Sequence, residues 1–215
     1  MSIQLIGRHN SYNVQKVLWL LDELKIEFLH TPLGGQPGDT ETDDFAKLNP
    51  MRKVPVLVDG ENVIWESNTI LRYLVNQYGH DDWKKLDAYD ISIYERWMDW
   101  AITRFEPAFV EVFWGYYRTP EAARDMTRVQ KGIAACLDCL EKLDRQLQDK
   151  NYLLGGRLSL ADICTGVFIY RMANVGLEIP LPGNLSNWYA RLQQRSAYSK
   201  WVMSDFSSLK GRLIY

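Results

Sequence analysis

The pattern of apolar and polar residues divides the chain near residue 80. Before that point, short apolar runs typical of strands alternate with segments in which apolar residues recur at helical spacing. The expected order is strand, helix, strand, helix, strand, strand and helix, which gives one mixed sheet with helices packed on it. The expected strands are 2–6, 26–31, 54–58 and 63–65, and the expected helices are 13–25, 43–48 and 66–78.

The second part of the chain has a helical pattern with no convincing strand. A long helical stretch is expected over 88–117, with a bend at Pro107. Thr119-Pro120 is typical of the start of the next helix. An apolar stripe at helical spacing then runs over 129–147.

A capping motif predicts another helix in this second part. Ser159 stands three residues before Asp162, as in a capping box with Asp in place of the usual Glu or Gln. We therefore expect an α/β plus all-α protein. A small α/β domain would occupy 1–79 and an all-helical domain 88–215, with a short linker between them.

Composition and charge argue against several classes of protein. The 215 residues include 27 acidic and 25 basic side chains, and a net charge of −2 does not fit a nucleic-acid-binding protein. The longest unbroken apolar runs, such as 17–21, are far shorter than the ~20 residues of a membrane helix. The first residues contain no apolar signal core, so a cytoplasmic location is expected. The histidines never lie at ligand spacing with a cysteine, and no metal site is expected.

The cysteines are too few for a disulfide scaffold, since the chain has three. Cys136 and Cys139 have the spacing of a redox motif. They lie in the middle of a predicted helix, on its apolar stripe, and core packing is the favoured interpretation.

Several local motifs follow one another at intervals typical of one family. They are Asn10-Ser11-Tyr12-Asn13, Leu48-Asn49-Pro50, Lys53-Val54-Pro55-Val56-Leu57, Trp65-Glu66-Ser67-Asn68, Ser159-Leu160-Ala161-Asp162 and Asn187-Trp188-Tyr189. Together they resemble the cytosolic glutathione S-transferases over nearly the whole chain, and bacterial theta- or nu-like members in particular. The resemblance implies an N-terminal thioredoxin-like domain that binds glutathione and a C-terminal helical bundle.

The resemblance also implies that the first helix activates the glutathione thiol. A thiol of pKa about 8.5 is only about 3% thiolate at pH 7, and lowering that pKa by about two units requires about 2.7 kcal/mol. A hydroxyl donor and backbone N–H groups at a helix N-terminus can supply this free energy. Ser11 is the expected catalytic donor, and the amide of Asn13 is an alternative. Either residue could instead be only the helix N-cap. The segment 8–16 holds no cysteine, which disfavours a mechanism with a protein cysteine.

Four further residues are expected to bind glutathione. By resemblance, the peptide bond before Pro55 is cis, the backbone of Val54 pairs with the cysteinyl part, and Lys53 binds the glycyl carboxylate. Ser67 would bind the α-carboxylate of the γ-glutamyl group at a helix N-terminus, and Glu66 its ammonium group. The alternatives are a trans proline at a strand start, an exposed lysine and an ordinary helix cap.

The electrophile site is expected between the two domains. Aromatic residues are dense over 105–117, and an aromatic pocket suits flat or apolar electrophiles. Phe113, Trp114 and Tyr117 are the candidates, with core packing as the alternative for each. Arg8 follows the first strand and would favour anionic electrophiles such as haloacids.

The predicted function is that of a glutathione transferase that attacks small aromatic or halogenated electrophiles, as in detoxification. Glutathione would be the co-substrate, with no other cofactor. A glutathione-dependent disulfide-bond reductase and a non-enzymatic glutathione-transferase-like binding protein are the alternatives. The resemblance further implies a symmetric homodimer, without nucleic-acid or membrane partners.

Overall fold

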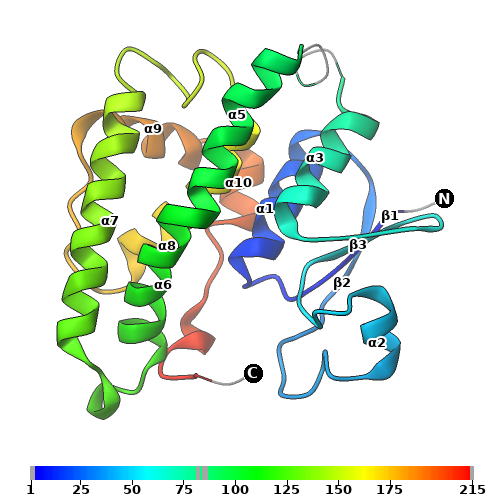
Figure 1. Ribbon diagram of the computed structural model, residues 1–215, viewed down its shortest axis with the longest axis horizontal. Helices are drawn as coiled ribbons and strands as arrows, with labels where there is room; N and C mark the ends of the chain where they lie inside the picture. Colours follow the sequence, from blue (N-terminus) through cyan, green and yellow to red (C-terminus); the bar gives the residue numbers. More distant parts are fainter. Residues whose placement is uncertain (1–2, 81–82, 84–86, 214–215) are drawn as a thin grey trace. The chain divides into compact units, whose positions relative to one another are not determined.

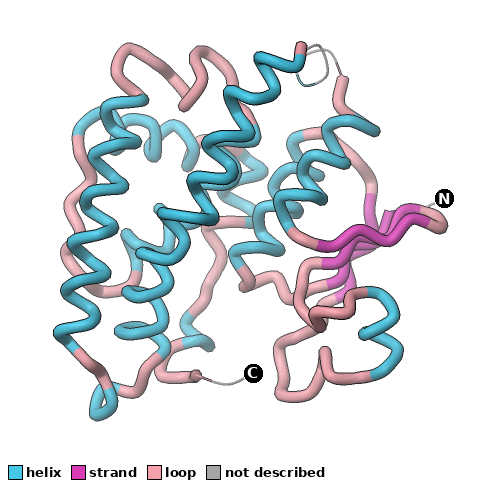
Figure 2. The backbone as a smooth tube through the Cα atoms, viewed as in Figure 1, coloured by secondary structure: helices cyan, strands magenta, loops and turns pink. Residues whose placement is uncertain are grey.

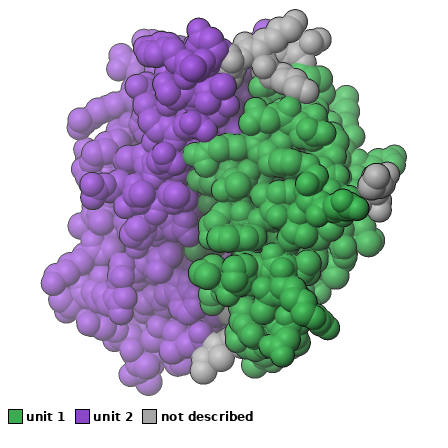
Figure 3. All heavy atoms as spheres, turned by 45° about the vertical axis from the view of Figure 1, so that its right-hand side comes forward, with its two compact units in different colours: residues 1–85, 200–204, 214–215 green, residues 86–199, 205–213 purple. Residues whose placement is uncertain are grey.

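The structure is a computed structural model that describes residues 3–80, 83 and 87–213. The chain forms two compact units (Figure 3). The first takes in the chain up to residue 85 together with residues 200–204, and the second takes in residues 86–199 and 205–213. Most of the expected linker lies outside the described residues.

The first unit is built on a sheet, drawn in magenta in Figure 2. Its strand order is β2-β1-β3-β4. β1 pairs parallel with β2, whereas β3 pairs antiparallel with both β1 and β4. The elements follow one another as β1 (Ile3–Ile6), α1 (Tyr12–Glu23), β2 (Phe28–Thr31), α2 (Asp43–Leu48), β3 (Val56–Asp59), β4 (Asn62–Trp65) and α3 (Ser67–Tyr78). The expected thioredoxin-like arrangement is confirmed.

The two faces of this sheet are covered by different helices. Because side chains alternate along a strand, Leu5 and Ile6 of β1 point to opposite faces, and both are buried. Ile6 and Val56 form a core cluster with Phe45 of α2. α1 and α3 lie side by side, apart from α2 (Figure 1).

The first unit also includes a short segment from late in the chain. Trp201 Nε1 and Lys200 Nζ both donate to Asp22 of α1, at 2.7 and 2.8 Å. Gln15 Nε2 donates to Ser204 Oγ at 2.8 Å. Burial raises the pKa of Asp22, but the bonds from Lys200 and Trp201 outweigh this effect and hold that pKa below its ordinary value.

The described residues of the second unit are helical or irregular. The helical elements are α5 (Ala88–Trp100), η1 (Ala101–Phe105), α6 (Glu106–Val112), η2 (Phe113–Arg118), η3 (Glu121–Ala123), α7 (Met126–Gln146), α8 (Leu160–Asn174), α9 (Gly183–Gln193), α10 (Ser196–Trp201) and η4 (Ser207–Leu209). α10 ends in the first unit. No helix among the residues placed by the structure has the length and apolar character to cross a membrane.

The long helix predicted over 88–117 is present as one helical path. Its α-helical hydrogen bonding changes to π-helical over Ala101–Phe105, just before Pro107. Proline has no N–H to donate to the carbonyl four residues earlier, and its ring clashes with that carbonyl. The wider π-helical turn accommodates both effects.

The predicted helix start at Thr119-Pro120 is wrong. Pro120 precedes only the three-residue turn η3, and α7 begins at Met126. Its N-cap is Asp125, whose side chain accepts a hydrogen bond from Arg128 N at 3.1 Å. The local proline signal resembles a helix start, but a better cap six residues later determines the boundary.

The predicted capping box at the start of α8 is confirmed, and it is part of a larger buried network. Asp162 Oδ2 accepts from the backbone N–H and the hydroxyl of Ser159, at 2.9 and 2.6 Å. Its Oδ1 accepts from Leu153 N at 2.8 Å and from Trp188 Nε1 at 2.9 Å. Burial raises the pKa of Asp162, whereas these four donors favour the ionised carboxylate. One carboxylate thus joins the loop before α8 to α9.

The three cysteines are buried, and none of them forms a disulfide bond. Burial raises the pKa of Cys136 to about 12 and also raises that of Cys139. Because the thiolate is the reactive form, we expect no cysteine to react with dithionitrobenzoate in the native protein. All three should react once guanidinium has unfolded the chain. Fast labelling of native Cys136 or Cys139 would contradict the core-packing interpretation.

Candidate functional site

The register of the sheet brings the predicted glutathione-site residues to one edge. Ile6 pairs with Val56, and Val56 pairs with Trp65. The chain therefore leaves β1 at Gly7, enters β3 after Pro55 and leaves β4 at Glu66, all at the same edge. α1 and α3 begin within a few residues of this edge.

Ser11 occupies the N-cap position of α1, with an extended backbone (φ −87°, ψ 123°) and a buried side chain. Its hydroxyl makes no capping hydrogen bond. By contrast, the side chains of Thr42 and Asp125 each accept a hydrogen bond from the third backbone N–H of their helices. The Ser11 hydroxyl therefore does not accept the hydrogen bond that an N-cap side chain usually accepts.

Asn13 connects the starts of two helices. Ser67 Oγ donates to Asn13 Oδ1 at 3.2 Å, which joins the first turn of α3 to the first turn of α1. In this arrangement the amide oxygen of Asn13 is the atom that contacts Ser67. The backbone N–H of Ser67 lies at the N-terminus of α3, where an anion is favoured.

Val54 lies between two glycines at this edge. The Val54-Pro55 peptide bond is cis, as the resemblance implies. A Cβ added to Gly7 would lie 3.1 Å from Val54 Cβ and 2.6 Å from Val14 Cγ2. A Cβ added to Gly34 would lie 3.6 Å from Val54 Cγ1. Both glycines have positive φ, 152° and 81°, so the close approach and the backbone conformation each favour glycine.

Arg8 and Thr40 lie around the same glycine. Arg8 Nη1 donates to Gly34 O at 2.9 Å. The position of a Gly34 Cβ would be 3.4 Å from Thr40 Cγ2 and 3.7 Å from Arg8 Nη1. The guanidinium of Arg8 thus joins the segment after β1 to the loop after β2.

Asn49 supports the site. It belongs to the Leu48-Asn49-Pro50 motif, but the sequence alone assigns it no role. It is 2% exposed, and its Nδ2 donates to Lys53 O at 2.8 Å while its Oδ1 accepts from Met51 N at 2.9 Å. Both bonds fix the backbone that leads into Val54. Lys53 itself is exposed, and it makes no ion pair with any described residue.

Glu66 is the N-cap of α3 and is exposed, with φ 70°. A positive φ is uncommon for a residue with a Cβ, and here it turns the chain from β4 directly into α3. Ser67 follows as the first helical residue and is buried. The turn therefore places one exposed carboxylate next to one helix N-terminus.

The three aromatic candidates lie in the second unit, in and around an aromatic stack. Phe113 is 1% exposed and stacks on Phe109 and Tyr117, with centroids 5.3 and 5.5 Å apart. The guanidinium of Arg118 lies 3.8 Å from the ring centroid of half-buried Trp114. Tyr117 is also buried. The burial of Phe113 and Tyr117 agrees with the core-packing alternative.

The sheet order, the cis proline and the two helix N-termini at one edge define a thioredoxin-like domain, followed by a helical unit. The family model described as the glutathione S-transferase N-terminal domain matches residues 1–76, and the one described as the C-terminal domain matches residues 121–191. The chain belongs to the glutathione S-transferase family.

Individual relatives support this assignment. The chain is 37% identical to glutathione S-transferase GstB of Escherichia coli over 208 residues, which are 95% of this chain and all of that one. It is similar to the theta class glutathione S-transferase of Xanthomonas axonopodis pv. citri with glutathione bound, with a TM-score of 0.89, 39% identity and coverage of 95% and 98%. Poplar glutathione transferase F1, at 20% identity with a TM-score of 0.81 over 93% and 96% of the chains, shares the fold.

Proposed function

We propose that this protein is a glutathione transferase that activates glutathione as a thiolate for attack on small electrophiles. One observation carries the proposal: Ser11 stands at the N-terminus of α1 with a hydroxyl that makes no capping bond. That hydroxyl can donate to a sulfur anion at a helix end where negative charge is favoured. α1 begins within a few residues of the edge of the sheet at which the cis Val54-Pro55 bond lies, which supports this role.

The rest of the glutathione molecule would follow the same edge of the sheet. The backbone of Val54 would pair with the cysteinyl part like an added strand, and the ammonium group of Lys53 would bind the glycyl carboxylate. The N-terminus of α3 at Ser67 would bind the γ-glutamyl carboxylate, and Glu66 its ammonium group. Asn13 would position Ser67 through their hydrogen bond.

A pair of assays tests the activity. Conjugation of glutathione to a haloaromatic substrate and reduction of hydroxyethyl disulfide by glutathione are measured on the same preparation. The proposal expects conjugation to dominate. Dominant disulfide reduction would indicate a glutathione-dependent reductase, and binding of glutathione without either activity would indicate a binding protein.

Replacement of Ser67 by alanine is expected to weaken glutathione binding about tenfold. The variant loses a hydroxyl beside the carboxylate and the bond that holds Asn13, which together correspond to about 1.4 kcal/mol. Calorimetric titration with glutathione gives the dissociation constant. Ser186→Ala, at an exposed serine in the first turns of α9, is the matched control and should bind normally. An unchanged affinity in Ser67→Ala would contradict the γ-glutamyl subsite.

We also propose that the protein is a homodimer, as the resemblance implies. Most oligomers of this kind are closed and symmetric, so two identical surface patches would meet. Analytical ultracentrifugation at micromolar concentration measures the mass directly. A single species at the mass of one 25.1 kDa chain would contradict the proposal.

A further inference from the structure

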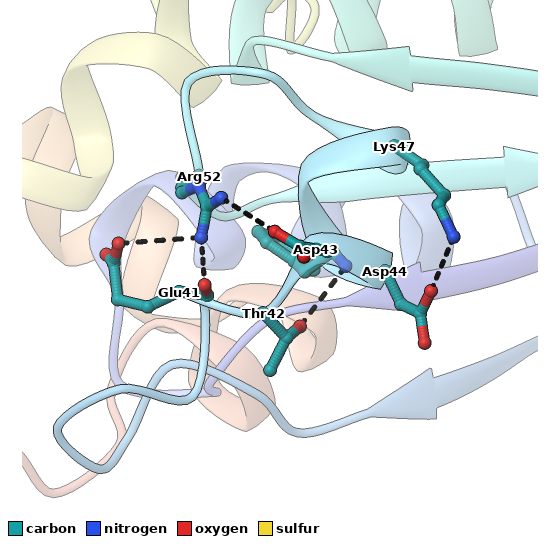
Figure 4. Close-up of polar contacts among 7 residues, drawn as sticks. Glu41, Thr42, Asp43, Asp44, Lys47 and Arg52 are labelled. Carbon is teal, nitrogen blue, oxygen red and sulfur yellow. Dashed lines mark hydrogen bonds and ion pairs between the residues drawn. The ribbon is translucent and has the colours of Figure 1, made fainter.

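The loop between β2 and α2 and the first turn of α2 carry several acidic side chains, two of which contact Arg52, the residue before Lys53. They are Asp39, Glu41, Asp43 and Asp44. Asp39 accepts from the backbone N–H groups of Gly35 and Gln36, at 3.1 and 2.9 Å. Asp44 pairs with Lys47 at 2.7 Å, on the far side of the first turn of α2 (Figure 4).

The remaining two acids share one cation, Arg52. Its guanidinium donates to the carbonyl oxygen of Glu41, lies 3.7 Å from the Glu41 carboxylate and lies 3.4 Å from Asp43 Oδ1 (Figure 4). The backbone of Arg52 has φ 53°, and its N–H donates to Asn49 O at 2.9 Å. Arg52 is thus directed from the 49–53 loop toward the acidic loop.

Lys53, the next residue, is the second of two consecutive cations. It is exposed and makes no ion pair with any described residue, although Arg52 beside it contacts two carboxylates. The two cations therefore have different partners. Arg52 neutralises the acidic loop, whereas the ammonium group of Lys53 remains available to a ligand.

We propose that Arg52 is a positioning residue for substrate binding: by pairing with Glu41 and Asp43 it keeps Lys53 free to bind the glycyl carboxylate of glutathione. The inference rests on the proposed function and extends it to a residue that does not touch the substrate. In the absence of Arg52, the two carboxylates attract the flexible ammonium group of Lys53 and repel the incoming carboxylate. Both effects are electrostatic, so they act on the charged end of glutathione.

Arg52→Gln tests this role, because glutamine keeps much of the side chain and removes the charge. Calorimetry should give a dissociation constant for glutathione about fivefold higher than that of the wild type, which is the scale of a partly exposed ion pair. For glutathione esterified at the glycyl carboxylate, the two proteins should bind within about twofold of each other. At saturating glutathione, kcat should be unchanged, since the sulfur is not affected.

The decisive control removes the competing acids. The triple variant Arg52→Gln, Glu41→Gln, Asp43→Asn should recover the wild-type dissociation constant to within about twofold. The double variant Glu41→Gln, Asp43→Asn, which retains Arg52, should not bind more weakly than the wild type. A role of Arg52 in loop structure alone predicts no recovery in the triple variant.

The outcomes separate this inference from the proposed function. Unchanged glutathione binding in Arg52→Gln, equal weakening for the ester, or no recovery in the triple variant would each overturn the role of Arg52 and leave the transferase proposal intact. Absence of glutathione binding in the wild-type protein would overturn both.

Discussion

Ser11→Ala is expected to lower the rate of glutathione conjugation about twenty-five-fold at pH 7. The Ser11 hydroxyl is buried, lies at the N-terminus of α1 and makes no capping bond. A hydrogen bond to a charged acceptor contributes about 1.5–3 kcal/mol, so its loss should raise the thiol pKa of bound glutathione by about one to two units. A shift from about 6.5 to about 8.5 reduces the thiolate at pH 7 from about three quarters to about 3%.

The loss of conjugation rate in Ser11→Ala should become smaller as the pH rises. The variant should recover as pH rises through the higher thiol pKa, because the thiolate then forms without the donor. At pH 9 its rate should approach that of the wild type, whereas the wild type should change little above pH 7.5. The ultraviolet absorbance of the thiolate in the enzyme–glutathione complex measures the same pKa independently of turnover.

Asn13→Ala is the companion variant, since the amide of Asn13 is the alternative donor. Its oxygen already accepts from Ser67, so we expect weaker glutathione binding and a smaller shift of the thiol pKa than in Ser11→Ala. A larger shift in Asn13→Ala would move the catalytic role to Asn13. If both variants leave the turnover and the thiol pKa unchanged, the assignment is wrong.

Asp162→Ala is expected to be the most destabilising single change, with a loss of at least about 3 kcal/mol. The substitution leaves four donors without their acceptor, namely Leu153 N, Trp188 Nε1 and both the backbone N–H and the hydroxyl of Ser159. Each unsatisfied buried donor costs about 1–3 kcal/mol. For a chain of this size, such a loss lowers the melting temperature by about 6–12 °C.

Two further variants show whether the network or the helix cap is responsible. Asp125→Ala removes an exposed N-cap with one hydrogen bond and should cost only about 1 kcal/mol. Asp162→Asn keeps the shape but has one acceptor oxygen for four donors, so it should be nearly as unstable as Asp162→Ala. Equal effects of Asp125→Ala and Asp162→Ala in calorimetric melting would mean that Asp162 acts as an ordinary cap.

The sequence predicts most of the first unit because its signals are local. The two-residue hairpin turn at Gly60-Glu61 and the strands on either side determine the register of β3 and β4. That register then brings Val54 and Glu66 to one edge. Thr119-Pro120 shows the limit of local signals, since a proline at a suitable position begins only a short turn and Asp125 begins the helix.

The polar contacts that organise the site are harder to predict. The bond between Asn13 and Ser67 joins residues 54 positions apart, and the contacts of Arg52 with Glu41 and Asp43 span 11 and 9 positions. Each depends on how loops fold back, which residue types alone do not encode. The role of the aromatic residues over 105–117 is equally ambiguous in the sequence. A helix stripe that packs in a core and a helix stripe that lines a pocket have the same spacing.

Because residues 200–204 belong to the first unit, that unit is built from two separate stretches of the sequence. A protein cut after residue 80 would lose the donors from Lys200 and Trp201 to Asp22 and the partner of Gln15 at Ser204. Exchange of the first 80 residues between two relatives would likewise transfer an incomplete folding unit. The two units are therefore expected to be inherited together, and a recombinant gene that mixes them must also match the α10 segment.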